Sequence, residues 1–126
     1  MKVMMLIAHG SRKSAANDEV RRLAERIADI GGGDYDAVRA AFLELAEPDI
    51  QQGIDECIAQ GATEIVAVPY FLANGRHVGA DIPGELACAQ AGHPQVRIRL
   101  SQYLGQNEAM ADLVLRCSRL AAEPRD

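Results

Sequence analysis

The sequence has no excess of basic residues, no closely spaced cysteine pair and no long apolar run. Its formal net charge is −5, whereas nucleic-acid phosphates are bound by basic surfaces, so nucleic acid is not the expected partner. The three cysteines, Cys57, Cys88 and Cys117, are scattered and form no Cys-X-X-Cys motif. This pattern favours a reducing compartment over a disulfide framework. We expect all three cysteines to be small apolar core residues.

The apolar run near the amino terminus, residues 3–8, is much shorter than the about 20 residues that a membrane-spanning helix requires. It leads directly into the polar segment 9–13, with no small-residue cleavage site of a signal sequence. The chain has 126 residues, 48% of them hydrophobic and 25% charged, which is typical of one globular domain. We therefore expect a single domain over residues 1–126, with 123–126 as a frayed tail. The expected location is the cytoplasm, without a membrane segment.

Four strand-like segments alternate with four segments of helical periodicity. Two of the strand-like segments are continuously apolar, and the other two alternate between apolar and polar residues. In chain order, the expected strands are 2–8, 35–45, 65–68 and 96–101. The expected helices are 14–30, 48–60, 81–91 and 107–121, with Pro48 in the first turn of the second and with Asp81 and Pro83 as start signals of the third.

Strands that alternate with helices form a parallel sheet with right-handed crossovers and with helices on both faces. The two continuously apolar strands, the first and the third, belong in the middle of the sheet, and the alternating strands belong at its edges. The sequence therefore predicts an α/β fold of the flavodoxin-like type, with strand order 2-1-3-4. Its topological switch point lies between the first and third strands.

Three polar side chains follow three successive strands. His9 directly follows the first strand, Glu44 closes the second, and His77 lies in the loop after the third. Ligands of open parallel sheets bind outside the carboxyl ends of the strands, so we expect these residues to lie close together. Two imidazoles and a carboxylate suit Co²⁺, Fe²⁺, Ni²⁺ or Zn²⁺, and they can also accept protons near neutral pH.

Spacing alone leaves alternatives open, because no H-x-x-x-H or H-E-x-x-H motif is present. His9 could be an ordinary loop residue and Glu44 a solvated edge-strand residue. His93, in a turn before the fourth strand, is expected at the opposite end of the sheet in a structural role. Histidine phosphatases also have a His-Gly pair at the end of their first strand. Their His is preceded by Arg, however, where this chain has Ala8. A second Arg–His cluster of that class is not found in the sequence.

The segments LIAHGSRK, FLELAEPDI and VPYFLANGRHVGADIP closely resemble the sirohydrochlorin chelatases of the CbiX/SirB type. The resemblance extends over nearly the whole chain, in the same order and spacing. That family inserts a divalent metal ion into sirohydrochlorin on the way to sirohaem or cobalamin. Its His in the HGS segment matches His9, its Glu in the FLE segment matches Glu44, and its His in the GRHV segment matches His77.

The resemblance implies a lyase-type chelatase of the class II, chelatase-like fold that exchanges Fe²⁺ or Co²⁺, and less so Ni²⁺, for two pyrrole protons without an organic cofactor. His9 and His77 would hold the ion and accept protons, and Glu44, the third expected metal ligand, would supply negative charge that offsets the ion and helps to remove the protons. The residues expected to contact the carboxylate-rich substrate are Ser11, Arg12, Arg76 and Gly75. Many relatives contain two such domains, so this short form is expected to homodimerise. The alternative is a non-catalytic carrier of metal or tetrapyrrole that uses the same pocket.

Overall fold

The computed structural model describes residues 1–31 and 33–124, and it confirms the predicted sheet. All strand pairs are parallel and the order is β2-β1-β3-β4. The strands are β1 (Lys2–Ala8), β2 (Ala37–Phe42), β3 (Glu64–Pro69) and β4 (Arg97–Leu100). The helices are α1 (Ser14–Ile30), α2 (Ile50–Ala59), the π-helix η1 (His77–Asp81), α3 (Ile82–Gly92), the 3-10 helix η2 (Leu104–Gln106) and α4 (Ala109–Arg119).

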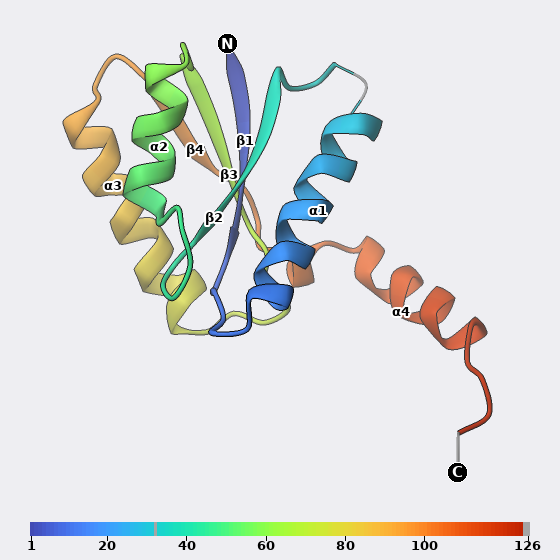
Figure 1. Ribbon diagram of the computed structural model, residues 1–126. Helices are drawn as coiled ribbons and strands as arrows, with labels where there is room; N and C mark the ends of the chain where they lie inside the picture. The colour runs from blue at the N-terminus through green and yellow to red at the C-terminus, as the bar shows by residue number, and fades with distance from the viewer. Residues whose placement is uncertain (32, 125–126) are drawn as a thin grey trace.

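Helices cover both faces of the sheet, as predicted. Figure 1 shows α1 on one side and α2 with α3 on the other. Side chains of a strand alternate between the two faces, and the larger core lies under α2 and α3. It contains Val3, Met5, Ile7, Ile50, Ile54, Ile65, Ile82 and Leu86, all nearly inaccessible to solvent. β1 and β3 are continuously apolar because they lie in the centre of the sheet, where both of their faces are covered.

The ends of several elements differ from the sequence prediction. β2 covers 37–42, shorter than the expected 35–45, although backbone hydrogen bonds to the end of β1 continue through Leu43 and Glu44. β4 is likewise shorter, at Arg97–Leu100. Pro48 lies before α2 and not in its first turn, because Asp49 is the N-cap. Asp49 and Gln52 form a reciprocal capping box at 2.8 and 3.0 Å, which fixes where α2 begins.

The last helix departs most from a layered α/β packing. Figure 1 shows α4 standing away from the sheet. None of its residues is buried, including the apolar residues Met110, Leu113, Val114 and Cys117 that mark its periodicity. In the part of the chain that the structure describes, no helix has the length and apolarity needed to span a bilayer. Of the expected frayed tail, Glu123 and Pro124 are exposed and without regular structure, and 125–126 lie outside the described residues.

The expectation that all three cysteines are core residues is wrong for two of them. Cys57, on α2, is buried in the main core, whereas Cys88 and Cys117 are exposed and free. Cys88 lies on α3 beside the cleft described below, and Cys117 lies on α4, which stands apart from the core. Helix-start signals placed Cys88 in a helix and apolar periodicity placed Cys117 in one, both correctly, but neither signal shows which helix faces are covered.

Burial raises the pKa of the Cys57 thiol, with an opposing contribution from the Arg39 charge. Because only the thiolate is an effective nucleophile, we expect iodoacetamide at pH 8 to modify Cys88 and Cys117 quickly and Cys57 slowly. Intact-mass spectrometry over time should show two additions per chain, with the third appearing only in denaturant. Equal rates at all three thiols would contradict this placement of Cys57.

Candidate active site

Gly10 brings the first two candidate residues together. The chain after β2 continues to pair with the chain after β1, since the Glu44 N–H donates to the His9 carbonyl at 3.1 Å. Gly10 has a φ of +96°, and a Cβ built on it would lie only 1.7 Å from the Glu44 carbonyl oxygen. Only glycine allows this approach. The close contact leaves His9 Nε2 3.6 Å from Glu44 Oε1.

Replacing Gly10 by alanine should therefore destabilise the fold strongly. The substitution adds a backbone clash to the strain of a positive φ, each costing about 1–3 kcal/mol. Gly61→Ala is the matched control, because Gly61 has a φ of +106° but open space around its position. Chemical denaturation of both variants should show an excess loss of ~1–3 kcal/mol in the free energy of unfolding for Gly10→Ala. Equal losses would contradict the close approach of residues 10 and 44.

The π-helix η1 positions the third candidate residue. His77 begins this helix and Asp81 ends it, and the π-type hydrogen bond runs from the Ile82 N–H to the His77 carbonyl. The Nδ1 atom of His77 lies 2.8 Å from Asp81 Oδ2. Sequence reasoning treated Asp81 only as a helix-start signal, but its side chain does not cap α3. The spacing of four residues from His77 was the signal that could have identified this pair.

The imidazoles of His9 and His77 lie side by side, with ring centroids 4.8 Å apart and planes inclined by 65°. Their side chains are 42% and 43% exposed, so a ligand can reach both. The Nδ1 of His9 lies 2.9 Å from the Gly10 carbonyl oxygen. A carbonyl only accepts hydrogen bonds, so this Nδ1 carries the hydrogen and Nε2 of the neutral ring has the free lone pair.

The His9 and Glu44 side chains are spaced as two ligands of one ion would be. Two ligand atoms at about 2.1 Å from a tetrahedral ion lie roughly 3.4 Å apart, close to the 3.6 Å between His9 Nε2 and Glu44 Oε1. Within residues 1–31 and 33–124, no group of three or more His, Cys, Asp or Glu side chains is arranged to hold a metal ion. The structure nevertheless brings His9, Glu44 and His77 to one edge of the sheet, and the His9 and Glu44 side chains are spaced as two ligands of one ion.

Asn17 fixes the loop that carries His9, and sequence reasoning missed it. It is the buried polar residue of α1, and its side chain closes two hydrogen bonds with the Ser11 backbone. The Ser11 N–H donates to Asn17 Oδ1 at 2.9 Å, and Asn17 Nδ2 donates to the Ser11 carbonyl at 2.8 Å. A single Asn on a helix gives no sequence signal of such a clamp, because its partner is set by the folded loop.

The four residues expected to contact substrate lie in the two loops beside the histidines. The Ser11 hydroxyl accepts a hydrogen bond from the Lys13 N–H at 3.1 Å, and Arg12 is exposed. Arg76 is 87% exposed, with its Nε 3.8 Å from Asp81 Oδ1. A Cβ on Gly75 would meet nothing, so sterics do not require glycine there. The two arginines are therefore available cations, whereas Ser11 serves the loop itself.

A cleft of about 610 Å³ extends from the candidate site toward α3. It is lined by Leu43, Glu44, Gln51, His77, Ala80, Asp81, Gly84, Glu85 and Cys88. Glu85 in its wall is held by Gln51, whose Nε2 donates to Glu85 Oε2 at 2.7 Å. The residues that line the cleft therefore include three carboxylates and the imidazole of His77.

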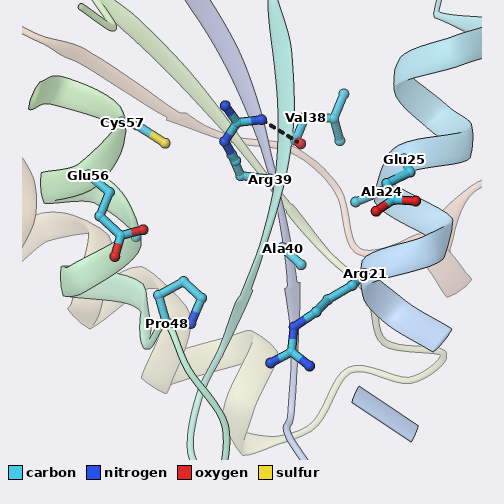
Figure 2. Close-up of a pocket in the computed structure, with 10 residues that line it drawn as sticks. Arg21, Ala24, Glu25, Val38, Arg39, Ala40, Pro48, Glu56 and Cys57 are labelled. Atoms are coloured by element: carbon cyan, nitrogen blue, oxygen red, sulfur yellow. Dashed lines mark hydrogen bonds between the residues drawn. The ribbon is translucent and has the colours of Figure 1, made fainter. Parts of the chain in front are cut away.

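A second, smaller hollow of about 280 Å³ lies along the open edge of β2, between α1 and α2 (Figure 2). Its two arginines are already engaged. Arg39 donates to the Val38 carbonyl and to Gln60, and Arg21 pairs with Asp18 and the Glu47 carbonyl. This hollow lies at the middle of β2, away from the strand end that carries Glu44. His93 is also remote from the site, bonded through Nε2 to Asp55 Oδ1 at 3.0 Å.

Known proteins are similar to this chain in sequence and in fold. A sirohydrochlorin ferrochelatase of Priestia megaterium is 34% identical over 115 residues, which are 91% of this chain and 42% of the relative. A sirohydrochlorin cobaltochelatase of Methanosarcina acetivorans is 34% identical over 120 residues, which are 90% of this chain and 91% of the relative. The solved structure of SirB from Bacillus subtilis with Fe³⁺ matches with a TM-score of 0.83 at 30% identity, covering 98% of this chain and 48% of that chain.

The chain spans about half the length of several of the relatives it matches, between 42% and 57%. The relative from Methanosarcina acetivorans, in contrast, is matched over nearly all of its length. The family model CbiX matches residues 3–120, almost the entire chain. Sequence, fold and family model agree with the resemblance found in the three motif segments. The chain belongs to the CbiX family.

Proposed function

We propose that this chain is a sirohydrochlorin chelatase, which inserts a divalent metal ion into the tetrapyrrole and releases two protons. The observation that carries the proposal is the grouping of His9, Glu44 and His77 at the carboxyl edge of the sheet. The relatives named sirohydrochlorin ferrochelatase and cobaltochelatase support this substrate and this reaction. Fe²⁺, for sirohaem, and Co²⁺, for cobalamin, are the proposed ions, since nitrogen and oxygen ligands suit both.

The proposed mechanism uses the two imidazoles and the carboxylate in turn. Nε2 of His9 and Oε1 of Glu44, at 3.6 Å, would hold the incoming ion between them. His77, whose ring lies 4.8 Å from that of His9, would share the ion or accept one pyrrole proton, and Glu44 or solvent water would take the remaining proton. Insertion exchanges two N–H protons for one ion without a redox step, so the proposal includes no organic cofactor. Partial exposure of all three side chains lets a flat ring approach them.

The surroundings of the three residues suit a tetrapyrrole with carboxylate side chains. Exposed apolar residues follow the ends of β2 and β3, namely Leu45, Tyr70 and Leu72. Such residues can cover the flat apolar face of a ring. Arg12 and Arg76 lie in the two histidine-bearing loops, where their guanidinium groups can pair with carboxylates. We therefore propose these two arginines as substrate contacts.

We also propose that the protein acts as a homodimer through α4. None of the residues of α4 is buried in the described structure, including its apolar stripe of Met110, Leu113, Val114 and Cys117. An isolated helix of 11 residues is marginal in water. A second copy of the chain that covers this stripe would therefore stabilise α4. The base of α4 is anchored at the carboxyl edge of the sheet, where the Gly105 N–H donates to the Phe71 carbonyl at 2.9 Å. A second copy held by this helix would lie at the edge that carries the proposed site. The exposed free thiols agree with a cytoplasmic location.

The experiment that tests the function is a multiple-turnover assay. Metal-free sirohydrochlorin and Co²⁺ or Fe²⁺ are mixed with the protein under anaerobic conditions, and the absorption spectrum of the tetrapyrrole is followed. A chelatase converts many equivalents of substrate per protomer, faster than the uncatalysed reaction. Conversion that stops at one equivalent per protomer would instead identify a carrier of metal or tetrapyrrole and would overturn the proposal.

A further inference from the structure

The structure assigns a positioning role to Asp81: it holds His77 in the tautomer whose Nε2 can take a metal ion. This inference rests on the proposed function and extends it to a residue outside the three-residue site. Asp81 Oδ2 lies 2.8 Å from His77 Nδ1, a distance typical of a charge-assisted hydrogen bond. An ionised carboxylate only accepts hydrogen bonds, so Nδ1 of His77 is the donor and the Nε2 of a neutral ring has the lone pair.

The local backbone supports this role over a capping role. Asp81 is the residue before α3, where a carboxylate would ordinarily accept from the first N–H groups of the helix. Its side chain makes no such hydrogen bond. The π-helix η1 instead turns the two ends of the segment, His77 and Asp81, toward each other. The other oxygen, Oδ1, lies 3.8 Å from Nε of the exposed Arg76.

The two site histidines are therefore fixed by different partners. His9 donates from Nδ1 to the Gly10 carbonyl at 2.9 Å, and His77 donates from Nδ1 to a carboxylate. Both leave Nε2 as the ligand atom, and the partner on the second nitrogen orients a ligating imidazole and raises its basicity. His93 is bonded in the opposite sense, since its Nε2 faces Asp55 Oδ1 at 3.0 Å. Of the three histidines of the chain, His93 therefore serves as an internal control with the opposite expected tautomer.

The inference is tested first without any metal or tetrapyrrole. Long-range ¹H–¹⁵N correlation spectra of the ¹⁵N-labelled protein at pH 8 distinguish the two tautomers of each ring. We expect hydrogen on Nδ1 for His9 and His77 and on Nε2 for His93. Asp81→Ala should release His77 into exchange between tautomers, and Asp55→Ala should do the same only for His93. Hydrogen on Nε2 of His77 in the wild-type protein, or on both of its nitrogens, would overturn the inference.

The second readout is the affinity for Co²⁺ alone, measured by titration of the metal-free protein. Loss of a partner that orients a ligand typically weakens metal binding by about 10–100-fold. We expect this loss for Asp81→Ala, with a matching rise in the KM for Co²⁺ and a smaller change in kcat, and no loss for the control Asp55→Ala. Equal Co²⁺ affinities of wild type and Asp81→Ala would overturn the inference. The NMR spectra and the Co²⁺ titration use no tetrapyrrole and do not depend on turnover. Failure of the chelatase proposal would therefore be seen separately, in the multiple-turnover assay.

Discussion

Replacing His9 or His77 by alanine is expected to lower the rate of metal insertion by at least about 100-fold, the usual contribution of a positioned proton acceptor. Each substitution also removes one of the nitrogen atoms proposed to hold the ion. The side chains of both residues are more than 40% exposed, and His9 is hydrogen-bonded to its own loop. Such surface substitutions usually change stability by less than about 0.5 kcal/mol. The initial rate with Co²⁺ and sirohydrochlorin measures the effect, and thermal unfolding checks the fold.

The third histidine supplies the control for this experiment. His93 is bonded to Asp55 at the amino-terminal end of the sheet, and its replacement by alanine should leave the insertion rate within about twofold of wild type. The two insertion rates should be similar because His93 lies far from the proposed ion position. A near-wild-type rate for both His9→Ala and His77→Ala, or an equal loss in all three variants, would remove the support for the assigned site.

Placing glutamates on the apolar stripe of α4 is expected to convert a dimer into a monomer. In the double variant Leu113→Glu, Val114→Glu, two side chains per protomer lose a contact worth about 1.5–3 kcal/mol each when fully buried. A symmetric dimer loses four such contacts, so the dissociation constant should rise at least about 10,000-fold. Light scattering coupled to size exclusion should show the wild type at about twice the protomer mass and the variant at 13.6 kDa.

Leu115 provides the matched control on the same helix. It is 51% exposed, close to the 61% of Val114, but at 100° per residue it lies on the other side of α4 from the stripe. Leu115→Glu should therefore leave the mass of the dimer unchanged. If the wild type is a monomer at micromolar concentration, or if Leu115→Glu dissociates it equally well, the proposed role of α4 is wrong.

The sheet could be predicted from the sequence because burial leaves a direct signal in each strand. The continuous apolar runs at β1 and β3 identified the two central strands, and alternation identified β2 and β4 as edges. Their ends were less predictable. Asp49 starts α2 through a reciprocal bond with Gln52, which overrides the preference of Pro48 for a first helical turn. The departure of α4 from the sheet could not be predicted, because its periodicity indicates an apolar face but not what covers that face.

The proposed site was predictable at the level of the strand ends and not at the level of side-chain partners. His9 and Glu44 follow paired strands, so parallel register alone predicts their proximity. Their 3.6 Å spacing depends in addition on Gly10, whose missing side chain admits the Glu44 backbone. Asp81 marked the start of α3 correctly, but its contact with His77 was missed because the same residue type serves helix starts and histidine partners. Only the π-helical turn of η1 shows which role it takes.

The most direct test of the account is the position of the metal ion. Crystals of the protein soaked with Co²⁺ would be measured at the cobalt absorption edge, where an anomalous difference map locates the ion. We expect a peak about 2.0–2.2 Å from His9 Nε2, with Glu44 and His77 as the neighbouring donors. The peak should be absent in His9→Ala crystals treated in the same way. A peak at another position, such as the His93–Asp55 pair, with none at His9, would contradict the account.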